Sequence, residues 1–269
     1  MRNRSLACFV ALVVAVATPS FAHDFWLAST SWTPAAGAAW TVTAQVGEHF
    51  PKPETGPTPD RVELWRVVGP QGDVQVTRDF RTEKTMLSAD VRLPAAGAYL
   101  GVMTILARTI EMKGQEFTDY LKEEGLDGVI AARRASGESD KPGKERYARY
   151  AKIAVRNGAG SADHLTRPAG LKAEFVPTSD PTAVRAGRSL TVQFLVDGKP
   201  VPGAAVTAAG PAEGASVKGR TDQNGRVTLT LDRAGAWLIK TVHMTRLPSG
   251  STEDWESFWV TLALHTSAT

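Results

Sequence analysis

The residues best suited to chemistry stand together at His23-Asp24-Phe25-Trp26, directly after a segment with the features of a secretory signal peptide. A cut after Ala22 would make His23 the first residue of the mature protein. A terminal histidine offers two ligands on one residue, the α-amine and a ring nitrogen, and the amine deprotonates more readily than a lysine. The motif therefore predicts a metal site at the mature N-terminus.

The first 22 residues contain the three parts of a signal peptide. Arg2 and Arg4 form a basic region, residues 6–17 are apolar, and Ser20 and Ala22 supply the small residues of a cleavage site. This apolar stretch is too short to span a membrane, and no later segment approaches the ~20 uninterrupted apolar residues that a spanning helix needs. We therefore expect an exported, periplasmic or secreted protein that does not span a membrane.

Further metal ligands must be nitrogen or oxygen atoms, because the single cysteine, Cys8, lies in the signal peptide. Such a ligand set suits Cu(II) or Ni(II), and also Zn(II). A second imidazole beside the amine and ring of His23 would complete the three-nitrogen arrangement called a histidine brace. We favour His243 over His49 for this role, because its position on a strand fixes its direction. Asp254 is a candidate oxygen ligand.

Several other kinds of site are excluded. Phe25 is the third residue of the mature chain, where the amino-terminal square-planar metal site requires histidine. The sequence contains no Gly-x-Ser-x-Gly elbow, phosphate loop or dinucleotide fingerprint. The net charge of +3 includes Arg2 and Arg4 of the signal peptide, so the mature chain is nearly neutral. We therefore expect no nucleic-acid partner.

The elements that must position these residues are mainly strands. Alternation of apolar and polar residues predicts strands at 40–46, 61–67, 90–93, 99–106, 189–196, 205–207, 227–231, 237–244 and 257–265. Glycine- and proline-rich turns separate them, as is typical of antiparallel sandwiches. We expect a mainly β protein with two immunoglobulin-like β-sandwich domains, at residues 23–112 and 171–269.

Residues 113–170 have a different pattern. Apolar residues recur at helical spacing over 117–130 and again over 145–155. We therefore expect two or three helices between residues 115 and 156, inserted between the β domains and followed by a glycine-rich joint up to Gly170.

Five motifs together resemble one family. They are His23–Leu27, Tyr120–Leu126, Glu145–Lys152, Trp237–Met244 and Asp254–Trp259. The set is similar to the DUF4198 proteins, exported bacterial proteins often labelled NikM-like or nickel uptake substrate-specific. The resemblance implies a periplasmic β-rich protein linked to metal uptake or metal handling. His23 and His243 fall inside its motifs, and His49 lies beside a weaker one.

These observations lead to one functional prediction and two alternatives. We expect a non-enzymatic periplasmic protein that binds a divalent transition metal through His23 and passes it to a membrane uptake system. The first alternative is a cell-envelope scaffold that recognises a protein or glycan, with affinity supplied by some of the seven tryptophans. The second is a copper-dependent oxidative enzyme that uses a histidine brace.

Overall fold

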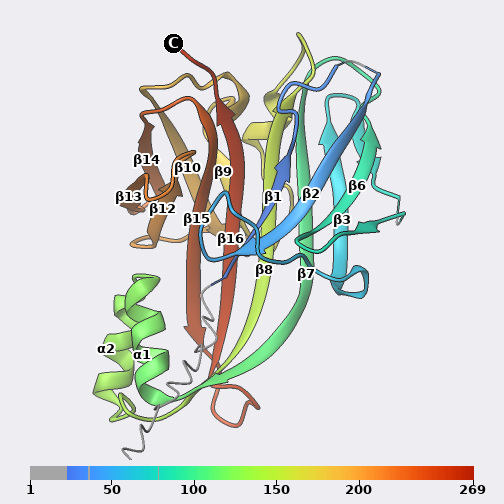
Figure 1. The fold of residues 1–269 in the computed structure, drawn as a ribbon. Coiled ribbons are helices and arrows are strands. Elements are labelled where there is room, and N and C mark those ends of the chain that lie inside the picture. Colours follow the sequence, from blue (N-terminus) through green and yellow to red (C-terminus); the bar gives the residue numbers. More distant parts are fainter. Residues whose placement is uncertain (1–22, 36, 78) are drawn as a thin grey trace, which may run out of the picture.

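The computed structural model describes residues 23–35, 37–77 and 79–269, so the predicted signal peptide lies outside the described residues. Within them the protein is mainly β and contains several sheets (Figure 1), as its composition predicted. In this part of the chain no helix combines the length and apolar character needed to cross a membrane.

The largest sheet has eight strands in the order β13-β12-β15-β16-β8-β7-β3-β4. They are β3 (Val62–Gly69), β4 (Gly72–Gln75), β7 (Ala98–Met112), β8 (Gly143–Arg156), β12 (Ala205–Ala209), β13 (Ser216–Arg220), β15 (Gly235–Arg246) and β16 (Trp255–Thr266). Neighbouring strands are antiparallel, except that β16 and β8 are parallel. One sheet therefore joins strands from all three predicted segments.

Two smaller sheets cover opposite faces of the large one. The first contains β1 (Asp24–Ser29), β2 (Ala39–Gly47), β5 (Arg81–Thr82) and β6 (Met86–Arg92); the second contains β9 (Ala173–Pro177), β10 (Arg188–Val196), β11 (Lys199–Pro200) and β14 (Arg226–Leu231). On β7, Tyr99 and Met103 enter the core under the first sheet, whereas Leu100 and Val102 enter the core under the second. This alternation follows from the two-residue period of a strand. We call the two sides of the large sheet its N-terminal and C-terminal faces, after the sheet that covers each.

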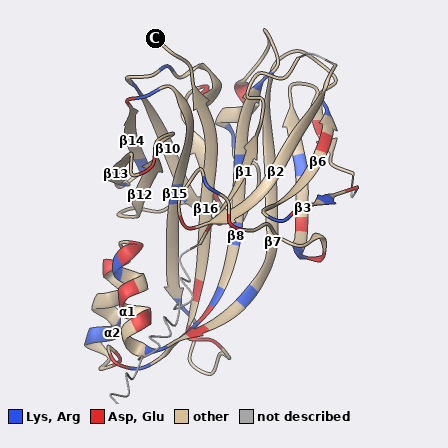
Figure 2. Ribbon diagram, viewed as in Figure 1, with Lys and Arg blue, Asp and Glu red and all other residues tan. Residues whose placement is uncertain are grey.

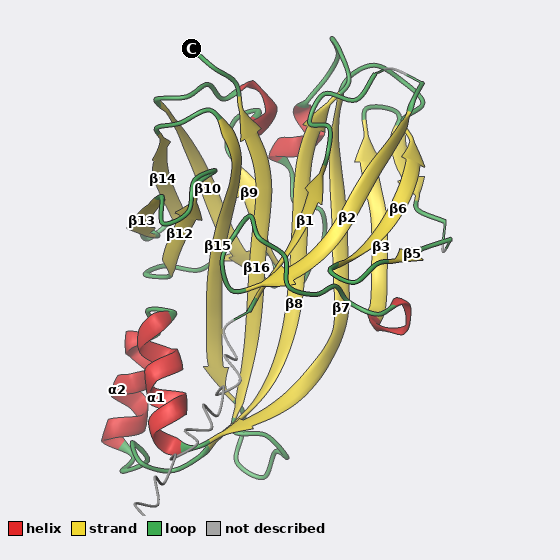
Figure 3. Cartoon of the chain, in the orientation of Figure 1, coloured by secondary structure: helices red, strands yellow, loops and turns green. Residues whose placement is uncertain are grey.

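Two helices follow β7 and precede β8. They are α1 (Gly114–Glu123) and α2 (Asp127–Ala135), and they lie side by side near one end of the large sheet (Figure 3). Phe117 and Tyr120 of α1 share a core with Trp255 and Trp259 of β16, and the rings of Tyr120 and Trp259 stack with centroids 5.8 Å apart. The pair therefore packs on the N-terminal face. Three short 3-10 helices, η1 (Pro59–Arg61), η2 (Asp163–Thr166) and η3 (Pro181–Ala183), lie in connections.

The prediction of a helix over 145–155 was wrong, because these residues form most of β8. The segment 151–155 is buried between β7 and β16 and covered on both faces. A strand buried in this way loses its alternation and cannot be told from a buried helix by periodicity alone. The one charged residue of segment 151–155 is Lys152, which forms an ion pair with buried Glu174.

The strands that the sequence predicted are present, with ends that differ by a few residues. The predicted domain boundaries at residues 112 and 171 do not separate the sheets, since β8 lies between β7 and β16. What positions the candidate site is therefore the large sheet, with β1 laid across its N-terminal face.

Candidate functional site

His23 lies immediately before β1, and the register of that strand determines its surroundings. Asp24 pairs with Gly47 at the end of β2, so the preceding residue lies beside the turn that follows β2. That turn folds back on the strand, because the amide of Glu54 donates to the carbonyl oxygen of Val46 at 2.9 Å. Strand pairing and turn together bring His23 and Glu54 into contact across 31 positions of sequence.

The contact joins Nε2 of His23 to Oε2 of Glu54 at 2.8 Å, with 27% and 50% of the two side chains exposed. The other carboxylate oxygen, Oε1, accepts the Glu48 amide at 3.1 Å. The Glu48 amide, and then His23, lower the pKa of Glu54, so its carboxylate is ionised and can only accept. In the neutral His23 ring, Nε2 therefore carries the proton and Nδ1 keeps its lone pair.

His49 lies on the same turn. Its side chain is exposed, and its positive form is near enough to contribute to the lowered pKa of Glu54. The carbonyl oxygen of His49 accepts the amide of Lys52 at 2.8 Å, which closes the turn. The structure thus gathers His23, Glu54 and His49 at one end of the β1-β2 pair.

His243 lies on β15, but on the other face of the large sheet. Its ring is near Phe194 and Phe258, with centroids 6.0 and 6.5 Å away, and both belong to the core of the C-terminal face. Burial lowers the pKa of His243. Its neighbours Val242 and Met244 point to the N-terminal face instead. The expected pairing of His23 with His243 is therefore not formed, because the sheet separates their side chains.

Asp254 lies in the connection from β15 to β16. Its Oδ2 accepts the amide of Lys144 at 3.0 Å, and its own amide donates to the Lys144 carbonyl at 2.8 Å. These contacts tie the connection to the start of β8. Asp254 thus has a structural partner of its own at the start of β8.

Within residues 23–35, 37–77 and 79–269, no three His, Cys, Asp or Glu side chains are grouped so that they could hold a metal ion. A metal site at His23 would therefore depend on the α-amine that cleavage after Ala22 creates. The ring of His23 and the amine belong to one residue, so their proximity needs no further element of the fold.

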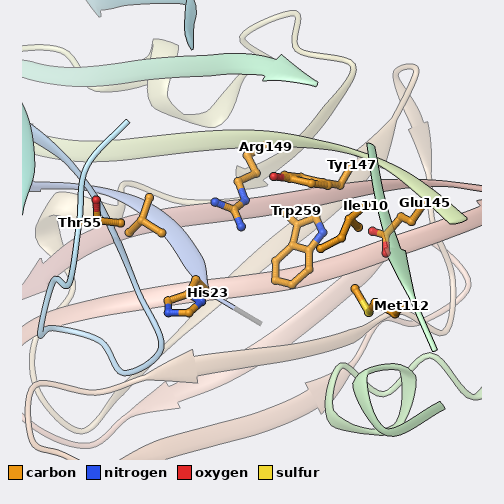
Figure 4. Close-up of a pocket in the computed structure, with 9 residues that line it drawn as sticks. His23, Thr55, Ile110, Met112, Glu145, Tyr147, Arg149 and Trp259 are labelled. Atoms are coloured by element: carbon orange, nitrogen blue, oxygen red, sulfur yellow. The ribbon is translucent and has the colours of Figure 1, made fainter. Parts of the chain in front are cut away.

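A cavity of about 240 Å³ opens beside His23 on the N-terminal face (Figure 4). Three adjacent strands of the large sheet supply its main wall, and the β2 turn closes its side. The lining residues are His23, Val46, Thr55, Ile110, Met112, Glu145, Tyr147, Arg149 and Trp259. The cavity is therefore largely apolar, with an imidazole, a guanidinium and a carboxyl group at its edges.

Glu145 is the buried acid of this cavity. Its Oε1 accepts hydrogen bonds from Tyr120, at 3.2 Å, and from Ser257, while Oε2 has no partner among the described residues. Nε1 of Trp259 is likewise buried without a partner there. Burial raises the pKa of Glu145. Ser257, Tyr120 and Trp259 lie close enough to oppose that rise, so the inner end of the cavity holds a buried carboxyl group and an indole N–H near each other.

Asp24, the second residue of the opening motif, anchors β1 to the large sheet. Its Oδ2 accepts from Nζ of Lys240 at 2.7 Å, with 5% of the Asp24 side chain exposed. Burial raises the pKa of Asp24, and Lys240 opposes that rise. One residue further on, the carbonyl oxygen of Phe25 accepts the hydroxyl of Thr261 at 2.8 Å. These two contacts hold the strand that presents His23.

Sequence reasoning missed Glu54, Glu145, Tyr147 and Arg149. The last three lie at every second position of β8, a spacing that indicates one face of a strand. That signal was present in the sequence but was hidden by the helical interpretation of the segment. Glu54 carried no local signal, because only the closure of the turn brings it to His23.

The tryptophans do not form an exposed platform. Six of the seven have no more than 6% of their surface exposed. Trp32 is half-buried, and its ring lies 5.7 Å from that of His265. In the described part of the chain these rings act mainly as core residues.

Comparison with known proteins gives one extensive match. A family model described as "Domain of unknown function (DUF4198)" matches residues 20–245. No curated protein sequence matches the chain.

Solved structures give only distant similarity. A Salmonella alpha-2-macroglobulin mutant is 10% identical over 91% of this chain and 15% of its own, with a TM-score of 0.25. Three N-terminal domains of the bacteriophage RB49 outer capsid protein Hoc are 13% identical over 90% of this chain and 59% of theirs, with a TM-score of 0.19. The Bacillus anthracis TIE protein is 11% identical over 94% of this chain and 59% of its own, with a TM-score of 0.17. Similarities of this size do not identify a function.

Proposed function

The chain belongs to the DUF4198 family, and we propose that it is an exported, periplasmic protein that binds a divalent transition metal through the N-terminal His23 of its mature form. Copper(II) and nickel(II) suit the nitrogen and oxygen donors best, and zinc(II) is also compatible with them. The protein would handle the metal as cargo for an uptake system rather than catalyse a reaction.

The contact between His23 and Glu54 is the observation that carries this proposal. Metal-binding histidines usually donate their second ring N–H to a carboxylate, which fixes the tautomer and the ring orientation. Glu54 is placed to accept from Nε2 at 2.8 Å and so leaves Nδ1 for a metal. Nδ1 is also the nitrogen nearer to the residue's own α-amine, so the two can act together.

The second imidazole, in this proposal, comes from His49 rather than His243. His49 is exposed on the turn that carries Glu54 and lies near enough to help lower the pKa of that carboxylate. His243 lies on the opposite face of the sheet, among Phe194 and Phe258. Asp254 is not a ligand in this proposal, because its carboxylate accepts the amide of Lys144.

The decisive experiment compares two forms of the protein that differ by one acetylated residue. Protein beginning at His23 is titrated with Cu(II) and Ni(II), by calorimetry and electron paramagnetic resonance for copper, alongside protein that retains Ala22. Retaining Ala22 with its own amine acetylated converts the amine of His23 to an amide and leaves no free amine nearby. It should weaken binding by about a hundredfold or more, because a joined pair of ligands becomes a single one. Equal affinity of the two forms would refute the proposal.

Variants then assign the remaining roles. Glu54→Gln should weaken metal binding by about tenfold, as expected when a carboxylate that accepts from a metal-binding histidine is lost. His49→Ala should remove one nitrogen from the copper spectrum. His243→Ala is the matched control and should change neither the affinity nor the spectrum, because its ring faces the other core. Mass spectrometry of the exported protein would identify its true N-terminus and any bound metal together.

We further propose that the two halves are immunoglobulin-like sandwiches that share the large sheet, with α1 and α2 as an insertion. This is supported by the way each small sheet covers one face of the large sheet over its own core. An experimental structure would test the strand order of each half.

A further inference from the structure

Three arginines gather around Tyr147 on the N-terminal face, and Arg149 among them also lines the cavity beside His23. Arg61 ends η1, Arg108 lies on β7 and Arg149 lies on β8. All three line a second cavity, of about 200 Å³, together with Tyr147. We call this cavity the arginine pocket. Figure 2 shows Lys and Arg positions on the lower parts of β7 and β8, with Asp and Glu positions in the same region.

A bulge in β7 is what brings Arg108 into this group. Ile105 pairs with Arg149 and Arg108 pairs with Tyr147, so three steps along β7 match two steps along β8. The extra residue reverses the alternation of β7, and Arg108 therefore faces the same side as Ile105. In a regular strand it would face the opposite side. Bulges often re-aim a side chain beside a functional site.

The charges of these arginines are not neutralised within the described part of the chain, where none of the three forms an ion pair. Nε of Arg61 and Nε of Arg149 are buried without a hydrogen-bond partner there. Arg61 donates to the carbonyl oxygen of Leu106, and its side chain also interacts with that of Tyr147. Arg149 lies over the rings of Tyr147 and Trp259, at 5.1 and 5.5 Å.

Three acids lie near the group, and each has other partners. Glu145, whose raised pKa Arg149 helps to lower, accepts hydrogen bonds from Tyr120 and Ser257. Asp24 acts on the charge of Arg149, but its carboxylate is held by Lys240 at 2.7 Å. Asp60 is the carboxylate near Arg61, and its pKa is lowered chiefly by a hydrogen bond with Thr58. Arg61 and Arg149 are half-buried and Arg108 is exposed. Partly buried cations without a close counter-charge are unfavourable, so an anion that enters the pocket is stabilised.

The pKa shifts of these arginines also favour a bound anion. Burial lowers the pKa of Arg149, and burial together with the like charge of Arg108 lowers the pKa of Arg61. Each guanidinium is nevertheless charged at neutral pH, because the starting value is so high. An oxyanion is the ligand that a planar guanidinium fork matches best.

The arginine pocket continues into the cavity beside His23. Both are lined by Thr55, Tyr147 and Arg149. Beyond Arg149 the wall is mainly apolar, with Ile110 and Trp259, and Glu145 lies at its inner end. A ligand that fills both parts must therefore be charged at one end and apolar at the other, which an inorganic anion is not.

We propose that the arginine pocket binds the carboxylate of a small organic acid, whose apolar body lies against Trp259 and Ile110. The arginines supply the charge-assisted hydrogen bonds, and the adjoining cavity selects the organic part. The proposal is independent of the metal, because no arginine here depends on the α-amine of His23.

Metal-free protein, treated with a chelator and beginning at His23, is the material for the test. 3-Phenylpropionate is the probe, inorganic phosphate is the comparison anion, and binding is followed by calorimetry and thermal melting. We expect saturable binding of 3-phenylpropionate and a concentration-dependent rise in melting temperature. Phosphate at the same concentration should bind at least tenfold more weakly.

Arg108→Gln is the principal variant, because Arg108 is exposed and its loss should leave the fold intact. The variant should lower the affinity for 3-phenylpropionate by about ten- to a hundredfold, as expected when a charged hydrogen-bond partner is removed. Arg146→Gln is the matched control. Arg146 lies on the neighbouring strand β8 and pairs with Glu256, so its loss should not change the affinity.

Three results would overturn the proposal: no binding of 3-phenylpropionate, equal binding of phosphate, or unchanged affinity in Arg108→Gln. Equal loss in Arg146→Gln would also count against it, since a general effect of charge would then explain the result. Because the protein is metal-free, failure here leaves the metal proposal untouched, and failure of the metal proposal leaves this one untouched.

Discussion

Replacing Lys240 by methionine tests how the opening motif is anchored. Lys240 is the only described cation in contact with buried Asp24, and their side chains are 24% and 5% exposed. Lys240→Met keeps the length of the side chain but leaves the Asp24 carboxylate without its partner. The half-buried Glu124, whose pKa burial raises to about 7, loses the attraction of the same ammonium.

The expected loss of stability follows from this burial. Removing one partner of a fully buried ion pair costs about 3–5 kcal/mol. Lys240 keeps partial exposure, so solvent compensates some of the loss, and we expect about 2–3 kcal/mol at pH 8. For a chain of this size that lowers the melting temperature by about 4–12 °C.

The loss should depend on pH in a definite direction. Burial already raises the pKa of Asp24 and of Glu124, and removal of Lys240 raises both further. A group whose pKa is raised on folding stabilises the fold below its unfolded pKa and loses that contribution as the pH rises through its folded pKa. The deficit of Lys240→Met relative to the wild type should therefore shrink from pH 8 to pH 5, as the two acids take up protons.

Urea unfolding at pH 5 and pH 8, followed by far-ultraviolet circular dichroism, measures both quantities. Lys218→Met is the matched control, because Lys218 lines the same surface cavity as Lys240 but is exposed. It should change the free energy of unfolding by less than about 0.5 kcal/mol. A deficit for Lys240→Met that is equally small, or that is the same at both pH values, would refute the reasoning.

Two further predictions concern the helices beside the site. The wild type should lose up to about 3 kcal/mol of stability as the pH rises from 5 to 8, because the pKa of Glu124 is about 7 in the folded protein. Glu124→Gln should remove this loss. Urea unfolding over that pH range measures it, and an unchanged dependence on pH would contradict the prediction. Gly143→Ala should cost about 1–3 kcal/mol by thermal melting, because its new Cβ would lie 2.2 Å from the Phe117 ring. Gly128→Ala on α2, where nothing lies within 4 Å, should be neutral or stabilise by up to about 1 kcal/mol; a similar loss at both glycines would show that the Phe117 contact is not the cause.

Strands whose two faces meet different surroundings were predictable from the sequence. β10 and β14 each alternate between a buried and an exposed or half-buried side, and this is the pattern that was recognised at 189–196 and 227–231. β8 was not predictable in this way. Its second half is covered on both faces, so no alternation of polarity remains.

The candidate site was predictable only in part. His23 was found because a processing signal precedes it, and that inference needs no structure. Glu54 was not found, since it reaches His23 only when the β2 turn closes. His243 was a wrong choice of partner for His23. Its position on a strand determines that its side chain alternates with those of its neighbours, but only the packing of the other sheets decides which core lies on each side.

By itself the sequence determined the family, the mainly β composition and the chemical character of the opening motif, because these depend on residue types and short spacings. Only the tertiary structure decided which residues meet. Strand pairing placed His23 beside Glu54, and the two-residue period of β15 turned His243 away. A one-residue bulge brought Arg108 opposite Tyr147. Contacts of this kind join positions far apart in the chain, and local patterns carry no record of register, bulges or the covering of a face.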